Sequence, residues 1–366
     1  MRQVRVLILF STSSLGGAER SLTRMALSPG DIHYEFATMQ NSGPWCDWLR
    51  SLGGTPVMFG SEKNHSNRIT LGACLRLIAY LHRHKFDALY VCGVRASFIL
   101  RCLRILMPRI KVVHGVRSNL DSDSKLDQFF RMIERYTHPL VDAWVTNSFV
   151  TKKTLQDRCN ISESKIEVIH NGLEKLPQHL PSYPSRPLEI LTIANLNLRK
   201  GYLEYLNVIQ GVIAQEPTVK FVFIGRDDMN GAVQAAISEN KLDSHIRYES
   251  FQADVSPWLR SARIFVLPSL WGEGCPTSIL EAYSFEIPVI AYEIDGIPEL
   301  ITNDIDGFLV RKLDIETLKD KILELIRNPE QAERFGKDGR RKVESEFTLI
   351  RCAKRHAQFF SKLCHD

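Results

Sequence analysis

Short apolar runs alternate with longer stretches of helical periodicity along the whole chain. In the first half the runs are VRVLILF, HYEFATM, ALYVCG, KVVHGV, AWVTNS and IEVIHNG. In the second half they are LEILTIANL, KFVFIG, IRYESF, RIFVLPS and PVIAYE. Nearly continuous apolar strands, each followed by a helix, are typical of parallel sheets that are buried on both faces. The pattern therefore predicts an α/β protein with doubly wound sheets.

One proline-rich break interrupts this alternation near the middle of the chain. The segment LEKLPQHLPSYPSRPLEI has prolines at positions 177, 181, 184 and 187. Four prolines in so short a stretch cannot lie within a helix or a central strand. We therefore expect an interdomain linker there and two domains, over residues 1–180 and 181–347. The spacing of ESEFTLIRCAKRHAQFFSKL predicts a final helix, over residues 348–366.

Length and composition agree with two soluble globular domains. The 366 residues exceed what one ordinary core needs. Hydrophobic residues make up 44% of the chain and charged residues 24%, which excludes a disordered or fibrous protein. No uncharged apolar run approaches the ~18 residues of a membrane-spanning helix. The first run continues into STSSLGGAER without a small-residue cleavage pattern, so we expect a buried strand rather than a signal sequence.

The cysteines indicate a reducing environment. There are eight, at irregular spacings, and no C-x-x-C pair occurs among them. This pattern argues against a zinc site and against a disulfide framework. The simplest location for such a chain is the cytoplasm.

The net charge of +5 is unevenly divided between the two halves. Residues 1–180 hold 24 Lys and Arg against 15 Asp and Glu, a balance of +9, whereas residues 181–366 hold 23 against 27, a balance of −4. A basic first half suits an anionic partner such as a phospholipid surface, a lipid phosphate or an acidic saccharide. The alternative is an ordinary solvated surface. We expect no nucleic-acid partner.

The candidate chemistry lies in the loops that follow the predicted strands, because ligands of open α/β sheets bind beyond the carboxyl ends of the strands. Glycines gather there, in SLGGAER, HGVRSN, ANLNLRKG and SLWGEGCP. No G-x-G-x-x-G follows a strand, which argues against a dinucleotide cofactor, and no G-x-x-x-x-G-K-[ST] phosphate loop occurs. The most informative stretch is WGEGCPTSILEAY, which separates Glu273 from Glu281 by seven residues.

The helix between these two acids suits an anion. Pro276 fits the first helical position, where its missing N–H would be unpaired anyway. The free amides that follow form an anion site, and a diphosphate fits it well. Glu273 and Glu281 could then accept hydrogen bonds from hydroxyls on either side, as a nucleotide sugar would require. Arg199 and Lys200, after the first strand of the second half, would stabilise charge on a departing diphosphate.

Two alternatives to this interpretation stay open at the level of residue spacing. Glu273 and Glu281 are either ordinary solvated acids, or they are the acid and the nucleophile of a glycosidase. The helix start argues against the glycosidase, because only a phosphate would use it.

These motifs resemble the retaining glycosyltransferases of the GT-B fold, family 4, whose signature is E-x7-E. The resemblance begins at GGAER and continues in family order through VTNS, VIHNGLE, ANLNLRKG, ARIFVLPSLWGEGCPTSILEAYSFEIPVIAYEIDGIPELI and DGFLV. It implies two Rossmann-like domains that face each other across a cleft. The first would bind the acceptor and the second the nucleotide sugar. The last helix would pack back on the first domain.

The resemblance also implies residue roles. Glu281 would bind the donor ribose, Glu273 would bind hydroxyls of the transferred sugar, and Lys200 with the backbone amides of residues 274–280 would hold the diphosphate. His114 would lie near the reacting sugar, although a lone histidine after a strand more often serves packing. The other residues placed at the donor are Gly16, Gly17, Asn195, Arg199, Phe251, Gly274, Cys275, Pro276, Thr277, Ser278 and Ile279.

Several positions depart from the family pattern. Ala194-Asn195 stands where the family usually has Gly-Arg, so one phosphate-binding cation is missing and Arg199 is its candidate replacement. FIGRDD lacks the usual Gly-x-Gly-Pro, and Cys275 replaces a common Phe. Two further alternatives therefore stay open: an epimerase or hydrolase that acts on the nucleotide sugar, or a catalytically silent subunit that only binds it.

The activity implied by the resemblance is transfer of a sugar, with retention, from a nucleotide-diphosphate sugar to a saccharide or lipid-linked acceptor. Such a reaction would serve the synthesis of cell-surface polysaccharide or lipopolysaccharide. No metal or other cofactor would be needed, because helix amides and cations take the role of the ion. The segment RASFILRCLRILMPRIK, residues 95–111, is either a core helix with a solvated edge or a contact with an anionic surface at the inner face of the cytoplasmic membrane.

Overall fold

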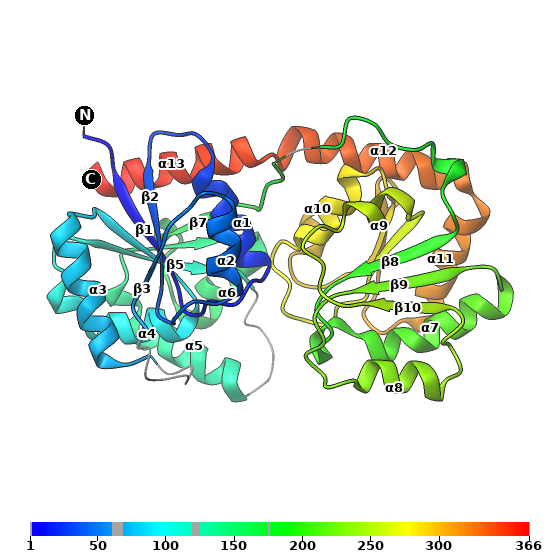
Figure 1. Ribbon diagram of the computed structural model, residues 1–366, viewed down its shortest axis with the longest axis horizontal. Helices are drawn as coiled ribbons and strands as arrows, with labels where there is room; N and C mark the ends of the chain where they lie inside the picture. The colour runs from blue at the N-terminus through cyan, green and yellow to red at the C-terminus, as the bar shows by residue number, and fades with distance from the viewer. Residues whose placement is uncertain (1, 61–68, 119–124, 175, 366) are drawn as a thin grey trace. The chain divides into compact units, whose positions relative to one another are not determined.

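The computed structural model describes residues 2–60, 69–118, 125–174 and 176–365, and the chain forms two compact units (Figure 1). Unit 1 comprises Met1–Gly172 and Leu349–Asp366, and unit 2 comprises Leu173–Thr348. Each unit has its own parallel β-sheet with apolar clusters on both faces. The predicted α/β class with two Rossmann-like domains is therefore confirmed.

The sheet of unit 1 has seven strands in the order β3-β2-β1-β4-β5-β6-β7. Alternate side chains of β1 enter opposite faces: Ile8 and Phe10 belong to one core cluster, Leu7 and Leu9 to the other. Burial on both faces is why the run is continuously apolar. The strands are β1 (Arg5–Phe10), β2 (His33–Thr38), β3 (Pro56–Met58), β4 (Ala88–Cys92), β5 (Lys111–Val116), β6 (Ala143–Thr146) and β7 (Ile166–Val168).

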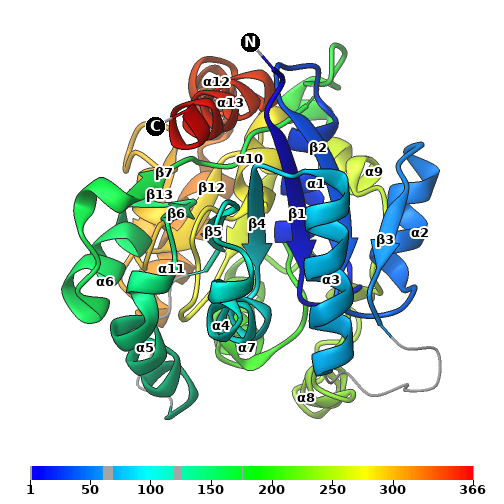
Figure 2. The ribbon, with the colours of Figure 1, turned by 90° about the vertical axis from the view of Figure 1, so that its left-hand side faces the viewer.

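Helices pack against both faces of this sheet (Figure 2). Leu22, Trp45 and Phe360 reach one core cluster from α1, α2 and α13, and Leu77 and Leu100 reach the other from α3 and α4. The last helix, α13, therefore belongs to unit 1. The helices are α1 (Gly17–Leu27), α2 (Pro44–Ser51), α3 (Leu71–His84), α4 (Val94–Cys102), α5 (Lys125–Thr137), α6 (Phe149–Cys159) and α13 (Leu349–His365).

The sheet of unit 2 has six parallel strands in the order β10-β9-β8-β11-β12-β13. The strands are β8 (Glu189–Ile193), β9 (Lys220–Ile224), β10 (Ile246–Glu249), β11 (Ile264–Leu267), β12 (Val289–Tyr292) and β13 (Gly307–Val310). The helices are α7 (Tyr202–Gln215), α8 (Ala232–Glu239), α9 (Ser256–Ser261), α10 (Thr277–Ser284), α11 (Ile315–Arg327) and α12 (Pro329–Glu346). Because β8, β11 and β12 are consecutive in this order, the loops that follow them leave the same edge of the sheet.

The eleven predicted strands all occur, and the described part of the chain adds β3 and β13. Both are short: β3 has three residues and begins with a proline, and β13 has four. Each is an edge strand of its sheet. Short 3-10 helices complete the described elements: η1 (Arg104–Leu106), η2 (His138–Leu140), η3 (Glu163–Lys165), η4 (Tyr183–Ser185), η5 (Leu198–Lys200) and η6 (Ile297–Glu299).

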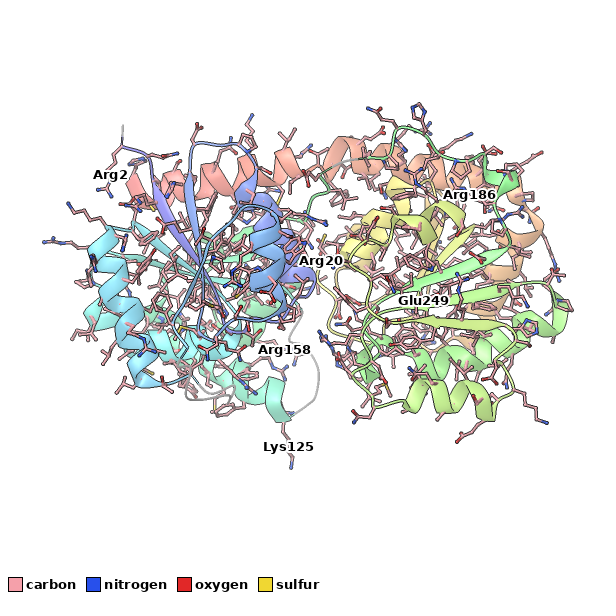
Figure 3. The ribbon with its side chains drawn as sticks, in the orientation of Figure 1. Arg2, Arg20, Lys125, Arg158, Arg186 and Glu249 are labelled. Atoms are coloured by element: carbon pink, nitrogen blue, oxygen red, sulfur yellow. The ribbon has the colours of Figure 1, made fainter. Side chains whose placement is uncertain are left out.

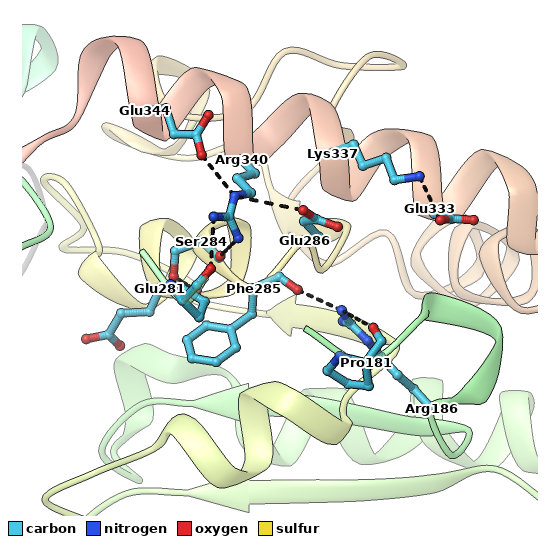
Figure 4. Close-up of polar contacts among 11 residues, drawn as sticks. Pro181, Arg186, Glu281, Ser284, Phe285, Glu286, Glu333, Lys337, Arg340 and Glu344 are labelled. Atoms are coloured by element: carbon cyan, nitrogen blue, oxygen red, sulfur yellow. Dashed lines mark hydrogen bonds and ion pairs between the residues drawn. The ribbon is translucent and has the colours of Figure 1, made fainter. Parts of the chain in front are cut away.

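The proline-rich segment belongs to unit 2, and the first boundary lies at Gly172 rather than near residue 180. Tyr183 is buried, and its hydroxyl donates to the Arg263 carbonyl oxygen at 2.9 Å. The buried Arg186 guanidinium (Figure 3) donates to the carbonyl oxygen of Phe285 at 3.0 Å (Figure 4). It also donates to the carbonyl oxygen of Ala262 at 3.3 Å. Within the described residues 177–187, the prolines leave room for one short 3-10 helix, η4, but for no α-helix or strand, and the Tyr183 side chain between them still packs on the second core.

Candidate active site

Two neighbouring strands of unit 2 position the candidate site. β8 leads to η5, which carries Arg199 and Lys200, and β11 leads to the loop that carries Glu273. A hydrogen bond from the Leu270 N–H to the Arg199 carbonyl oxygen, 2.7 Å, joins the two loops. The order of the strands therefore brings Arg199 and Lys200 close to Glu273, which follows them in the sequence by more than seventy positions.

Glu273 is a buried carboxylate, 6% exposed. Its Oε1 atom forms an ion pair with Lys200 Nζ and accepts a hydrogen bond from Ser269 Oγ at 2.6 Å. Burial alone would raise the pKa of Glu273, but the charge and hydrogen bond of Lys200, helped by Ser269 and by the charge of Arg199, lower it below the ordinary value. Glu273 is therefore ionised at neutral pH.

Two glycines with positive φ let these loops approach closely. Gly201 has φ 66°, and a Cβ there would collide with the Pro268 carbonyl oxygen. Gly272 has φ 82°, and a Cβ there would lie 2.7 Å from Arg199 Nη1. The exposed Arg199 guanidinium thus lies against the backbone just before Glu273. Both cations of the predicted pair are beside this acid.

Helix α10 begins at Thr277, one residue later than predicted, because Pro276 has an extended ψ of 115° and is the N-cap. No side chain caps this end of the helix. Thr277 and Ser278, the first two residues of the helix, are half-buried. Gly274 is buried, and the Cys275 and Ile279 side chains belong to the apolar core of unit 2. Those two residues could bind a ligand only through their backbone.

Glu281 lies in the second turn of α10 and is half-buried. Its carbonyl oxygen accepts a hydrogen bond from Ser284 Oγ at 2.7 Å. Its carboxylate is directed away from the Arg340 and Glu344 side chains of α12 (Figure 4). The two acids of the motif are therefore in different surroundings, one paired and buried and the other partly open to solvent.

Asn195 and Phe251 follow β8 and β10. The Asn195 Oδ1 atom accepts a hydrogen bond from the Arg226 N–H at 3.2 Å, so this side chain supports the loop after β9. The Arg226 guanidinium in turn contacts the Asp228 carboxylate, at 2.7 Å. Phe251 is 41% exposed. Phe251 lies in the loop at the carboxyl edge of the sheet, and its contact with a base stays a prediction.

In unit 1, His114 lies within β5 rather than in the loop after it, and it is only 1% exposed. Its Nδ1 atom is 2.8 Å from Arg101 Nη2 and 3.0 Å from Glu134 Oε1, and those two side chains form a buried ion pair of 2.8 Å. The structure thus places His114 in a buried polar network between α4 and α5. Its predicted role near a sugar stays a prediction.

The predicted glycine loop of unit 1 lies at the start of α1. Gly17 is the first residue of that helix, and Gly16 is its N-cap. The Gly16 N–H donates to Glu19 Oε2 at 3.1 Å, so a carboxylate of the chain itself lies at this helix end. No group of three or more potential metal-ligating side chains occurs within the described ranges. No described helix is long and apolar enough to cross a bilayer.

Sequence reasoning missed Ser269 and Asp295. Ser269 is fully buried two residues after the end of β11, and its hydroxyl reaches Glu273. Asp295 follows β12, and its Oδ2 atom accepts hydrogen bonds from the N–H groups of Gly272, at 2.6 Å, and Glu273, at 3.0 Å. The only signal for either residue was its place in a loop at the carboxyl end of a strand.

Two family models match consecutive parts of this chain. The model described as Glycosyltransferase Family 4 matches residues 15–175, and the model described as Glycosyl transferases group 1 matches residues 180–342. Together they cover most of unit 1 and nearly all of unit 2.

Curated relatives are similar at low identity. The UDP-Gal:alpha-D-GlcNAc-diphosphoundecaprenol alpha-1,3-galactosyltransferase of Escherichia coli is 23% identical, over 92% of this chain and 91% of its own. The amylovoran biosynthesis glycosyltransferase AmsK of Erwinia amylovora is 29% identical over 54% of this chain. That match spans about half (51%) of the length of AmsK.

Solved structures share the fold of the whole chain. HepE of Anabaena, in complex with UDP and glucose, has a TM-score of 0.86 at 17% identity and covers 98% of this chain and 100% of its own. The lipopolysaccharide outer core galactosyltransferase WaaB has a TM-score of 0.73, also at 17% identity, with coverages of 98% and 100%. Both likenesses extend over both units.

Proposed function

Because this chain belongs to the glycosyltransferases of family 4 and group 1, we propose that it transfers a sugar from a nucleotide-diphosphate sugar to a saccharide or lipid-linked acceptor. The observation that carries this proposal is the pairing of Glu273 with Lys200 beside Arg199. An ionised, buried carboxylate can accept hydrogen bonds from sugar hydroxyls. The adjacent cations suit a diphosphate.

The same pairing argues against Glu273 as the acid of a glycosidase. A glycosidase needs one carboxyl group that stays protonated long enough to donate a proton to the leaving oxygen, which requires a raised pKa. Lys200 and Ser269 instead lower the pKa of Glu273. We therefore assign Glu273 to binding of the transferred sugar and not to acid catalysis.

The reaction that we propose proceeds with retention and without a protein nucleophile. The acceptor oxygen attacks the anomeric carbon from the face that the diphosphate leaves. The bond between that carbon and the phosphate oxygen breaks as the new carbon–oxygen bond forms, and the acceptor proton passes to the departing phosphate. Lys200, with Arg199 in place of the cation missing at Asn195, would stabilise the growing negative charge.

The remaining donor contacts follow the family pattern. Glu281 would bind the ribose, and the backbone from Gly274 to Ile279 would bind the diphosphate, since the start of α10 has no side-chain cap. Phe251 would contact the base. The roles at the donor that the sequence predicted for three residues of unit 1 stay part of this proposal. These residues are Gly16, Gly17 and His114, and the contacts within the described part of unit 1 do not test their roles.

The relatives suggest which donor and acceptor to test first. HepE binds UDP and glucose, and the Escherichia coli enzyme is named for a UDP-galactose donor and a diphosphoundecaprenol-linked acceptor. Other relatives are named for exopolysaccharide synthesis. We propose a UDP-hexose donor, an acceptor carried on a lipid or a growing polysaccharide, and action at the inner face of the cytoplasmic membrane, which unit 1 would contact.

A thermal-shift screen with UDP-, GDP- and ADP-sugars tests this function. A donor present at 100 times its Kd stabilises the folded state by about 2.7 kcal/mol, so the melting temperature should rise with UDP-sugars. Product analysis with saccharide and lipid-diphosphate acceptors should then show a new linkage of unchanged anomeric configuration. Free sugar or an epimer formed without acceptor would indicate the hydrolase or epimerase, and donor binding without any turnover would indicate the silent subunit.

A further inference from the structure

The loop after β12 forms hydrogen bonds with both the backbone N–H and the backbone carbonyl oxygen of Glu273. Asp295 Oδ2 accepts from the Glu273 N–H at 3.0 Å and from the preceding Gly272 N–H at 2.6 Å. The Gly296 N–H donates to the Glu273 carbonyl oxygen at 3.2 Å. Two consecutive residues of one loop therefore hold the backbone of the acid that another loop carries. We call these three hydrogen bonds the Asp295 clamp.

The clamp requires an unfavourable backbone conformation. Asp295 has φ 47°, in the left-handed region where a side chain is disfavoured and glycine is the usual residue. Aspartate is among the few other residues that tolerate this region, because its short side chain can bond to nearby backbone. Glycine would adopt the same conformation without strain but would supply no acceptor for the two N–H groups.

The clamp completes the fixation of Glu273. Its side chain is held at Oε1 by Lys200 and Ser269, and its backbone is held by Asp295 and Gly296. With both ends fixed, the direction of Oε2 is determined before any ligand arrives. Hydrogen bonds that strengthen in a transition state depend on such preorganisation.

We propose that Asp295 is a positioning residue, which sets the orientation of Glu273 toward the transferred sugar through two backbone hydrogen bonds. This inference rests on the proposed function, because it concerns the sugar-binding role of Glu273. It goes beyond that function in assigning a role to a residue of a third loop. Asp295 acts here as an acceptor of hydrogen bonds and not as a base or a ligand of the sugar.

Three substitutions at this position separate the possible contributions. Asp295→Ala removes the acceptor and keeps the strain, Asp295→Gly removes the acceptor and relieves the strain, and Asp295→Asn keeps one oxygen that can accept both hydrogen bonds. Asp304→Ala is the control, because Asp304 is another aspartate of unit 2 with positive φ, 63°, although it is exposed where Asp295 is half-buried. It lies in the loop before β13, remote in sequence from Glu273.

The first experiment compares two quantities in each variant: kcat/KM for UDP-glucose and the Kd for UDP, which lacks the sugar. We expect kcat/KM for UDP-glucose to fall about tenfold in Asp295→Ala and Asp295→Gly, to stay within about threefold of wild type in Asp295→Asn, and not to change in Asp304→Ala. The Kd for UDP should stay within twofold throughout. Wild-type kinetics in Asp295→Gly, an Asp295→Asn variant as poor as Asp295→Ala, or an equal loss of UDP affinity would each overturn the proposal.

A second readout does not depend on activity. Hydrogen exchange of the Gly272 and Glu273 amides, followed by NMR or in peptides spanning residues 270–276, should speed up at least tenfold in the Ala and Gly variants at unchanged melting temperature. Unchanged exchange would overturn the clamp. If the wild type lacks transferase activity, the proposed function fails, whereas the exchange measurement still decides whether Asp295 fixes the backbone of Glu273.

Discussion

Burial and ionisation oppose each other at Glu273, and the partners of the side chain decide the outcome. An isolated carboxylate in this position would become neutral, because desolvation penalises its charge. Lys200 and Ser269 offset this desolvation by contacting the same carboxylate oxygen, Oε1, and Arg199 adds a second positive charge nearby. The cost of this arrangement is that Lys200 is bound to the acid before a donor arrives. The pair is therefore better understood as a preorganised site than as a source of stability.

The Lys200→Ala variant tests this interpretation at the residue scale. We expect turnover to fall on the order of 100-fold, because removal of one group that stabilises developing charge has an effect of that size in other enzymes. Steady-state kinetics with the donor that the wild type uses is the measurement. Lys319→Ala is the control, since Lys319 forms its ion pair with Glu316 on α11, away from the site. An unchanged rate in Lys200→Ala would refute the role.

Helices α4 and α5 are joined to β5 by a buried polar network. Arg101 of α4 and Glu134 of α5 are each 1% exposed and form an ion pair, and both contact His114 of β5. Burial would raise the pKa of Glu134, but His114 and Arg101 lower it to about 2. Arg101 is therefore part of the core of unit 1. Helical period alone cannot distinguish this buried arginine from the exposed ones of the segment 95–111, such as Arg109.

The Arg101→Met variant should destabilise unit 1. Methionine keeps an apolar stem of similar length but leaves the buried Glu134 with His114 as its one remaining partner in the network, so the loss should approach about 3–5 kcal/mol, the cost of a broken buried ion pair. The double variant Arg101→Met with Glu134→Gln should recover part of that loss, and Arg109→Met, at an exposed position, should have no effect. Denaturant unfolding monitored by circular dichroism gives these values. A loss below about 1 kcal/mol would contradict the assignment.

The same network gives a pH dependence. The folded-state pKa of Glu134, about 2, is below its ordinary value of 4.5, so the folded state binds this proton less readily than the unfolded chain does. Its contribution to stability is therefore complete above pH 4.5 and declines as the pH falls from 4.5 toward about 2. This range is far from neutral pH, so the network contributes fully at pH 7.

The charge of the whole molecule is concentrated in its first half, with +9 over residues 1–180 against −4 over residues 181–366. Part of the positive charge is paired within unit 1, since the buried Arg101 pairs with Glu134 and the half-buried Arg104 with Asp142. Other cations remain at the surface; Lys125, for example, projects from unit 1 (Figure 3). Within the segment 95–111, α4 packs in the core, whereas Ile105 and Leu106 of η1 are exposed. We propose η1 as the part of this segment that meets a membrane.

Co-sedimentation with liposomes tests this contact. The protein should bind vesicles that contain anionic lipid and not neutral vesicles, and binding should weaken with salt, because surface charges are screened. Replacement of Ile105 and Leu106 by serine should reduce binding several-fold. Ile350→Ser is the control, since Ile350 of α13 is as exposed, 79% against 85% for Ile105. Equal binding of neutral and anionic vesicles would exclude the electrostatic part of the proposal, and equal binding of both variants would exclude η1.

The sequence by itself determined the strands, the two sheets and the loops in which the candidate site lies. Local pattern is sufficient for this, because a strand buried on both faces must be apolar at every position, and parallel neighbours place their carboxyl ends at one edge. Glu273, Lys200 and Arg199 could therefore be assigned to one place although they are far apart in the chain. The edge strands β3 and β13 were not predicted.

Only the tertiary structure decided which partners these residues have. Ser269 contacts the carboxylate of Glu273 and Asp295 contacts its backbone N–H, and no local sequence pattern encodes either contact. Arg101 is buried beside a partner, Glu134, that lies on another helix. Tyr183, between the prolines, likewise packs on the core of unit 2. A hydrogen bond or ion pair depends on distances of a few ångströms between distant segments, and these distances are fixed by the packing of the whole unit and not by the spacing of residues along the chain.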